Sequence, residues 1–227
     1  MPVGLLAGQV KQRLSVVTPD RPRPFLRFAR LQGFRIWRRL FPLQWPVNPE
    51  GRLFINVGSG YVTHPLFVNV DALPAAHVHF SRTVEDLSPF NDDSADLIYV
   101  SHCLEHMSHR KVNSVLAEWR RVLKPGGVLR LGVPDFDQLL AFYEASGRNV
   151  EAIQPVLMGG QTYALNAHYT VFTEQSLTQR LLDVGFLAVR RWQWGTDELT
   201  SLPDHTAEAV EVGERIIHLS LNLEAIK

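Results

Sequence analysis

The chain has almost no cysteine, and this scarcity excludes a fold held together by intramolecular disulfides. Cys103 is the single cysteine among 227 residues, which fits a reducing compartment. Long apolar runs are also missing, because no stretch approaches the roughly 18 consecutive apolar residues that cross a bilayer. Gln9, Lys11 and Arg13 interrupt any apolar segment at the N-terminus, so we expect no signal peptide. The chain is therefore expected to be cytoplasmic, with one full domain and a substantial core.

A net charge is lacking as well, yet the zero balance hides an uneven distribution. Residues 1–50 contain nine Lys or Arg and two acids, a balance of +7, whereas residues 51–227 contain fourteen and twenty-one, a balance of −7. Apolar and arginine side chains over residues 25–41 recur at helical spacing and predict a helix. We therefore separate a basic, aromatic-rich N-terminal extension (1–50) from a domain (51–227).

The extension can dock on one of two surfaces, its own domain or a membrane. Complementary charge favours docking on its own domain, with the apolar side of the helix inward, as a lid beside a ligand cleft. The alternative is peripheral contact with an anionic membrane, which an arginine-rich amphipathic helix also suits. No nucleic-acid partner is expected, and the sequence leaves the oligomeric state open.

From residue 52 onward, short apolar runs alternate with helical stretches, which is typical of a parallel α/β sheet. Helices are expected over 112–123, after an Asp135 cap, and after a Thr173 cap. Residues 148–172 are expected to form an irregular, substrate-side insertion. The strict alternation over 216–226 predicts one antiparallel strand near the sheet edge. The remaining strands are expected at 53–57, 66–70, 77–80, 95–100, 128–133 and within 186–194.

The first chemical signal is the glycine turn "INVGSGY" followed by "VNVD". Glycines after a strand let the backbone approach a ligand too closely for a Cβ, and Asp71 at the end of the next strand can accept hydrogen bonds from ribose hydroxyls. A dinucleotide site needs a third glycine and a good helix N-terminus, but Tyr61 stands at that glycine position. The short crossover also leaves room for a turn or two of helix at most. The pattern therefore disfavours NAD and suits a nucleoside without phosphates.

Further blocks in the same order give the chain a family resemblance. They are "LSPFNDDSADLIYVSHCLEH" and "AEWRRVLKPGGVLRLGVPD", so the resemblance covers residues 53–135. This run is similar to the type 11 group of class I S-adenosylmethionine-dependent methyltransferases. The resemblance implies a Rossmann-like α/β fold: a mostly parallel seven-stranded sheet flanked by helices, with the last strand antiparallel. It also implies S-adenosylmethionine as the cofactor.

The resemblance implies where the cofactor contacts lie. The glycine loop would approach the methionine part, Asp71 the ribose, the segment at Val84 the adenine, and Ser101 the amino-acid end. This sequence departs from the family pattern at Asn56, where most class I enzymes carry an acid, and an extra Ser88 blurs which acid reaches the adenine. The cofactor-binding residues expected on these grounds are Asn56, Gly58, Ser59, Gly60, Asp71, Val84, Glu85, Ser101 and His102.

The segment "HCLEH" permits a rival interpretation. His102, Glu105 and His106 match the H-x-x-E-H pattern of inverted zinc proteases, in which two histidines on one helix face hold zinc. A zinc hydrolase would need a third protein ligand, and nothing in the sequence marks one. The motif also follows a predicted parallel strand, where the methyltransferase branch carries SHxLEH. We therefore expect no bound metal.

Methyl transfer to oxygen or nitrogen requires a base, and a histidine near its ordinary pKa suits that role. His102, Asp135 and His168 are the candidate catalytic residues. The acceptor is expected to be a small molecule or a glycan, because the family branch is similar to enzymes associated with surface glycans. A catalytically inactive S-adenosylmethionine-binding protein is the remaining alternative, since Asn56 replaces the usual acid.

Overall fold

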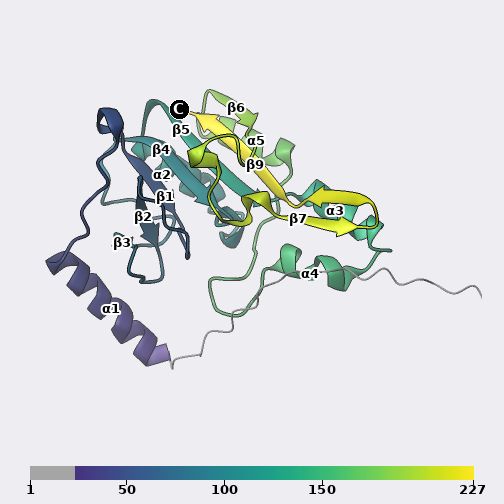
Figure 1. The fold of residues 1–227 in the computed structure, drawn as a ribbon, viewed down its shortest axis with the longest axis horizontal. Helices are drawn as coiled ribbons and strands as arrows, with labels where there is room; N and C mark the ends of the chain where they lie inside the picture. The colour runs from purple at the N-terminus through teal and green to yellow at the C-terminus, as the bar shows by residue number, and fades with distance from the viewer. Residues whose placement is uncertain (1–23) are drawn as a thin grey trace, which may run out of the picture.

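The computed structural model describes residues 24–227, so expectations for residues 1–23 lie outside the described part. Its centre is a seven-stranded sheet in the order β3-β2-β1-β4-β5-β9-β6, in which only β9 is antiparallel to its neighbours. This confirms the expected Rossmann-like architecture (Figure 1). The strands of the sheet are β1 (Phe54–Val57), β2 (Phe67–Asp71), β3 (Phe80–Ser81), β4 (Ala95–Ser101), β5 (Leu123–Pro134), β6 (Ala188–Arg191) and β9 (Ser220–Ile226).

Five α-helices and a separate hairpin surround this sheet in the described part. Figure 1 shows α1 beyond the β3 edge, and α3, α4 and the hairpin toward the opposite side. The helices are α1 (Pro24–Leu40), α2 (Val112–Val122), α3 (Phe136–Ala145), α4 (Val150–Met158) and α5 (Glu174–Asp183); the hairpin strands are β7 (Ala209–Val212) and β8 (Arg215–His218).

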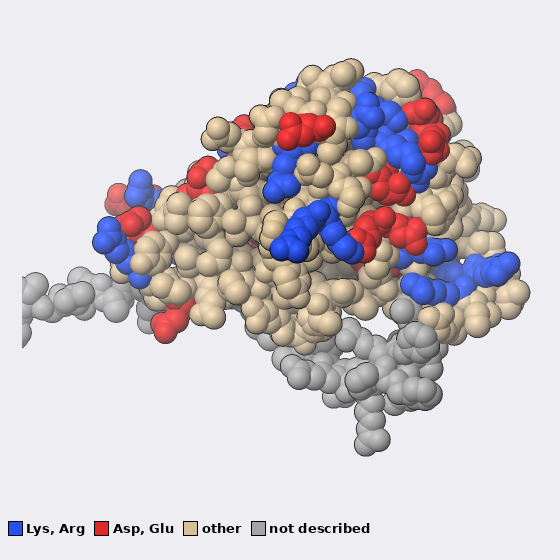
Figure 2. All heavy atoms as spheres, turned by 180° about the vertical axis from the view of Figure 1, so that it is seen from behind, with Lys and Arg blue, Asp and Glu red and all other residues tan. Residues whose placement is uncertain are grey.

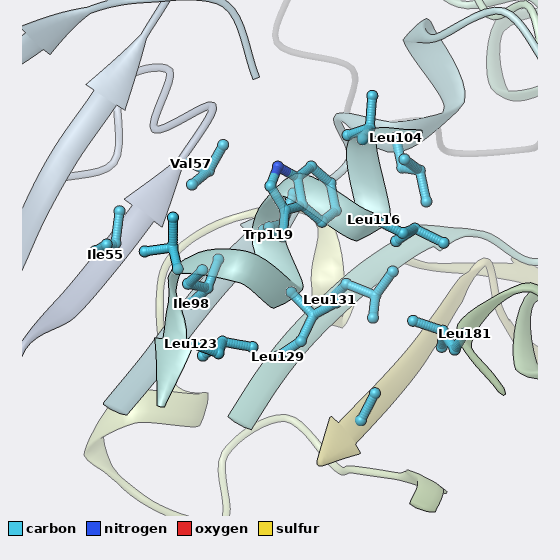
Figure 3. Packing of buried hydrophobic residues seen from close by; sticks show 14 of the residues in the cluster. Ile55, Val57, Ile98, Leu104, Leu116, Trp119, Leu123, Leu129, Leu131 and Leu181 are labelled. Carbon is cyan, nitrogen blue, oxygen red and sulfur yellow. The ribbon is translucent and has the colours of Figure 1, made fainter. Parts of the chain in front are cut away.

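The main core lies between the sheet and helices α2 and α5. Trp119 of α2 is fully buried and packs among apolar side chains of β1, β4 and β5 (Figure 3). Its indole Nε1 donates a hydrogen bond to the carbonyl of Val84 at 2.7 Å, which satisfies the one polar atom of that ring. Central parallel strands are covered on both faces, so their sequences are continuous apolar runs. All four residues of β1 are accordingly buried.

The opposite face of the sheet is covered by C-terminal residues, because the connection between β1 and β2 contains no helix. Residues 58–66 form turns and no helix, within the limit of one or two helical turns that the short crossover set. Trp192 and Leu202 from the C-terminal part pack there against Phe54 and Tyr99. The Tyr99 hydroxyl donates to Asp204 Oδ2 at 2.6 Å, which anchors the covering segment to β4.

Two local predictions differ from the structure. Residues 148–172 are not wholly irregular, because α4 forms there with Asn149 as its N-cap; the Asn149 side chain accepts from the Glu151 amide at 3.0 Å. The alternating run 216–226 is two strands, β8 and β9, separated at Leu219. One face of β9 is fully buried, as the alternation predicts, and on its half-buried second face Glu224 pairs with Arg130 at 2.6 Å.

The extension forms the expected helix, but the helix docks through its arginines. Arg38 is only 8% exposed and donates from Nε to the Val78 carbonyl at 3.0 Å, while Arg35 donates to the Ser81 carbonyl at 3.2 Å. Ile36, Trp37 and Leu40 are exposed, so the apolar side chains in this second half of α1 face outward, opposite to the expected orientation. Unpaired carbonyls at the β3 edge explain this, since guanidinium groups satisfy them and apolar side chains cannot.

Charged side chains on the domain surface are interspersed. Figure 2 shows basic and acidic groups side by side on the face opposite to that of Figure 1. Arg121, for example, contacts Asp92 at 2.6 Å and Glu118 at 2.7 Å. Among residues 24–227, no helix is long and apolar enough to cross a membrane.

Candidate functional site

A cavity of about 730 Å³ opens beside the carboxyl ends of β1, β2 and β4. Ligands of open α/β sheets bind at this edge, and the volume lies within the range of small-molecule sites. The walls come from the glycine loop after β1, the end of β2, the segment after β4, the loop after α4, and the turn around His205.

The two glycines of the loop after β1 have different physical roles. Both have positive φ, +70° at Gly58 and +54° at Gly60. A Cβ on Gly58 would collide with Sγ of Cys103, so this glycine is needed for close packing of the protein against itself. A Cβ on Gly60 would meet no atom within 4 Å. Gly60 therefore leaves space at the cavity wall that a ligand can use.

Asp71 holds this loop in place from the end of β2. Its Oδ2 accepts from the Gly60 amide at 2.8 Å, and its Oδ1 accepts from the Leu73 amide at 2.7 Å. Burial raises the pKa of Asp71, while the hydrogen bonds from Leu73 and Gly60 oppose that shift. Each carboxylate oxygen has a further lone pair, so Asp71 can still accept from a ligand hydroxyl.

Polar atoms without partners line the same cavity. The hydroxyl oxygens of Ser59 and Ser101 are buried and form no hydrogen bond with any residue in the described part. Buried hydroxyls are normally satisfied, so these two suit a ligand that brings its own polar groups. Together with Asp71 and the space at Gly60, they fit the nucleoside and amino-acid ends of S-adenosylmethionine.

Most of the residues predicted from the sequence meet at this cavity, and two do not. Asp135 lies outside it, because its Oδ1 caps α3 by accepting from the amides of Asp137 and Gln138. Glu85 is at the surface, where Lys111 contacts it at 3.0 Å. The predicted residues that line the cavity are Asn56, Gly58, Ser59, Gly60, Asp71, Val84, Ser101, His102 and His168.

The "HCLEH" segment does not form the helix that an inverted zinc-protease site requires. Only Leu104–His106 form a single 3-10 turn, η2, and His102 precedes it with φ at +49°. The two histidines therefore do not share a helix face, and that form of the hydrolase hypothesis is wrong. His102 instead turns toward the start of β9, where its Nε2 lies 3.0 Å from the Ser220 hydroxyl.

Glu105 occupies the centre of a histidine cluster at the cavity wall. Its side chain is 1% exposed. His102 Nδ1 lies 3.4 Å from Glu105 Oε1, and His168 Nε2 lies 4.0 Å from the same oxygen. The His106 and His168 rings are 4.8 Å apart between centroids. Burial lowers the pKa of His168, which favours its neutral form.

Two cavity residues near the C-terminus were not predicted from the sequence. His205 and Glu208 line the cavity from η4 (His205–Ala207) and the residue after it, with His205 Nδ1 3.0 Å from Glu208 Oε2. The His205 ring lies 5.5 Å from that of His102 between centroids. The segment has no strand or helix periodicity, so only its acid and histidine content could have drawn attention to it.

Part of the sequence that forms this site matches the model of a known protein family. Residues 68–131 match the family model described as a methyltransferase domain. This match confirms the resemblance to the type 11 methyltransferases in that segment. It spans β2 to β5, and so includes Asp71 and the segment after β4.

Two curated relatives match parts of the chain. An uncharacterized 37.1 kDa protein in transposon TN4556 of Streptomyces fradiae is 29% identical over 177 residues, which are 74% of this chain and 48% of that protein. A ubiquinone/menaquinone biosynthesis C-methyltransferase of Vibrio vulnificus is 38% identical over 72 residues, 30% of this chain and 27% of that enzyme. The chain thus spans about half or less of the curated relatives it matches.

Solved methyltransferase structures are similar to the chain at low sequence identity. A SAM-dependent methyltransferase from Archaeoglobus fulgidus superposes with a TM-score of 0.50 at 16% identity, covering 88% of this chain and 94% of that one. The 1,6-didemethyltoxoflavin-N1-methyltransferase of Burkholderia thailandensis gives a TM-score of 0.49 at 17% identity, with 93% of each chain covered. At these identities the likeness concerns the fold alone.

Proposed function

We propose that this chain, whose residues 68–131 match the methyltransferase-domain family, transfers a methyl group from S-adenosylmethionine to an oxygen or nitrogen of a polar acceptor. The single observation that carries the proposal is Asp71, a half-buried carboxylate at the end of β2 that fixes the glycine loop beside a cavity of about 730 Å³. Its position suits the two hydroxyls of a ribose.

The chain's own residues divide the work of binding. Asp71 holds the ribose of the nucleoside, the glycine loop lies against the methionine part, and the unpartnered Ser59 and Ser101 hydroxyls hold polar groups of the amino-acid end. S-adenosylmethionine supplies a methyl group already activated on a sulfonium sulfur. The protein therefore has to align donor and acceptor and exclude water.

His102 is the proposed base for the acceptor proton. Its side chain is 14% exposed and lines the cavity. The Glu105 Oε1 atom lies 3.4 Å from Nδ1 and orients the ring, as the third group orients a general base. Nε2 then faces Ser220 and the cavity, where it can accept a proton from an acceptor hydroxyl or amine.

The test is calorimetric binding of S-adenosylmethionine to the full chain and to Asp71→Ala. Loss of a hydrogen bond to a charged group costs about 1.5–3 kcal/mol, so the affinity is expected to fall roughly tenfold or more. Asp183→Ala is the matched control, because Asp183 is exposed on α5, away from the cavity. Equal affinity in the Asp71 variant and the wild type, with both folded, would refute the assignment.

A further inference from the structure

We infer that Glu105, His106 and His168 bind one divalent transition-metal cation at the wall of the cavity. Each residue offers one ligand atom, and these atoms lie within 4.8 Å of one another. The three side chains come from η2 and from the loop after α4, two segments far apart in sequence. His168 is thus the third ligand whose absence from the sequence pattern had argued against a metal.

Hydrogen bonds to backbone carbonyls fix the tautomers of both histidines. His106 Nδ1 lies 3.0 Å from the Ala167 carbonyl, and His168 Nδ1 lies 2.9 Å from the Val156 carbonyl. A carbonyl oxygen only accepts, so Nδ1 carries the hydrogen in each ring. In the neutral ring the lone pair is then on Nε2. Metal-binding histidines are oriented in this way by their other ring nitrogen.

The Glu105 carboxylate is the unsatisfied group of this cluster. Both carboxylate oxygens of Glu105 are buried and have no hydrogen-bond partner among residues 24–227. His102 Nδ1 lies 3.4 Å from Oε1, at the long end of hydrogen-bond distance. His168 Nε2 lies 4.0 Å from Oε1, the ligand atom of His106 lies within 4.8 Å of the other two, and a buried carboxylate requires a positive charge close to it. A bound cation supplies that charge and satisfies all three groups.

The backbone around the third ligand is built to hold it there. The amides of Tyr169 and Thr170 both donate to the Glu105 carbonyl, at 2.8 and 3.2 Å, and the Thr170 hydroxyl donates to the Met107 carbonyl at 2.7 Å. These bonds attach the loop carrying His168 directly to η2. A Cβ on Gly159 would lie 2.7 Å from the Asn166 carbonyl oxygen, so a glycine is needed where the loop closes against α4.

Two imidazole nitrogens and one carboxylate oxygen favour Zn²⁺ or Mn²⁺ among the common cations. With bonds of about 2.0–2.2 Å, tetrahedral ligand atoms lie roughly 3.4 Å apart, so modest side-chain rotation closes the site. Three protein ligands leave a coordination position open, and all three residues line the cavity. If the proposed function holds, that position selects an acceptor hydroxyl, because a divalent cation lowers the pKa of a bound oxygen.

The experiment uses the full chain, purified without a metal-affinity tag and stripped with a chelator. Calorimetric titration with Zn²⁺ alone and with Mn²⁺ alone is expected to show one saturable site per chain for at least one of them. His168→Ala and the near-isosteric Glu105→Gln are each expected to weaken the affinity at least tenfold. His109→Ala is the matched control, since this histidine is exposed and outside the cavity, and it is expected to bind as the wild type does.

The proposal is overturned if neither cation binds to the folded protein, or if binding is unchanged in folded Glu105→Gln and His168→Ala. S-adenosylmethionine binding is measured on the same samples and separates this inference from the proposed function. Cofactor binding without metal binding overturns the metal site and leaves the proposed function standing. Metal binding without cofactor binding supports the site and overturns its role with a methyl acceptor.

Discussion

Replacing Gly58 by alanine is expected to destabilise the protein through Cys103. The added Cβ would occupy the place of the Cys103 Sγ and would come within 3.2 Å of the Cys103 Cβ. The sulfur cannot leave easily, because it contacts the Ser101 carbonyl at 3.2 Å and the Gly58 carbonyl at 3.5 Å. The substitution also places a side chain at φ +70°, in the left-handed region.

Two costs add in this variant. Placing a non-glycine residue in the left-handed region lowers the free energy of unfolding by roughly 1–2 kcal/mol. Overpacking against buried atoms costs about 1–3 kcal/mol more. Removing the sulfur in Cys103→Ala abolishes the worse contact and keeps the backbone cost. Gly58→Ala is therefore expected to cost about 2–5 kcal/mol in the wild type and about 1–2 kcal/mol in the Cys103→Ala background.

The assay is urea denaturation of the four proteins in this double-mutant cycle. A coupling free energy of about 1–3 kcal/mol is the expected result. Gly60→Ala provides the control, because its Cβ would meet no atom within 4 Å and its cost is expected to be the same in both backgrounds. If Gly58→Ala costs equally with and without the Cys103 sulfur, the steric explanation of this glycine is wrong.

Two further predictions concern the C-terminal turn and helix α1. The hydrogen bond from His205 lowers the pKa of Glu208, and Glu208 raises the pKa of His205. The pairing adds to the free energy of unfolding only while His205 is protonated and Glu208 is ionised. This stabilisation is lost as pH rises through the raised pKa of His205, and it is also lost as pH falls through the lowered pKa of Glu208. Glu208→Gln is therefore expected to lower the unfolding midpoint in urea more at about pH 5.5 than at about pH 9, and an equal loss at both would contradict this pairing. Arg38→Ala removes charged hydrogen bonds of about 1.5–3 kcal/mol each and is expected to speed chymotryptic cleavage beside α1, whereas Arg39→Ala, at an exposed position, is not.

The central strands could be predicted from the sequence because burial on both faces leaves an unbroken apolar run. The run at 66–70 became β2 with a shift of one residue, and Asp71 marked its end correctly. The C-terminal strands were harder, because alternation continues through the break at Leu219. The amide of that residue bonds to the Glu208 carbonyl instead of to the sheet, and the alternating pattern contains no trace of this long-range contact.

The glycine loop could be located but only half explained. Its position after the first strand follows from the local sequence pattern. A glycine is required at position 58, however, because any Cβ there would collide with Cys103, which follows β4. The same distinction applies to α1. Its helical periodicity is local, but its orientation depends on carbonyls at the β3 edge that only the assembled sheet presents.

The histidine cluster shows why residue spacing alone could not decide the metal question. The H-x-x-E-H interpretation assumed a helix, and the third ligand was sought on another helix. The structure replaces the first helix with one 3-10 turn, and it brings His168 from a loop attached to the Glu105 carbonyl by two amides. That attachment uses backbone groups, so the side-chain types at Tyr169 and Thr170 did not reveal it. The segment that closes the cavity after α4 is therefore also the segment that completes the ligand set, and a change in the loop is expected to affect both together.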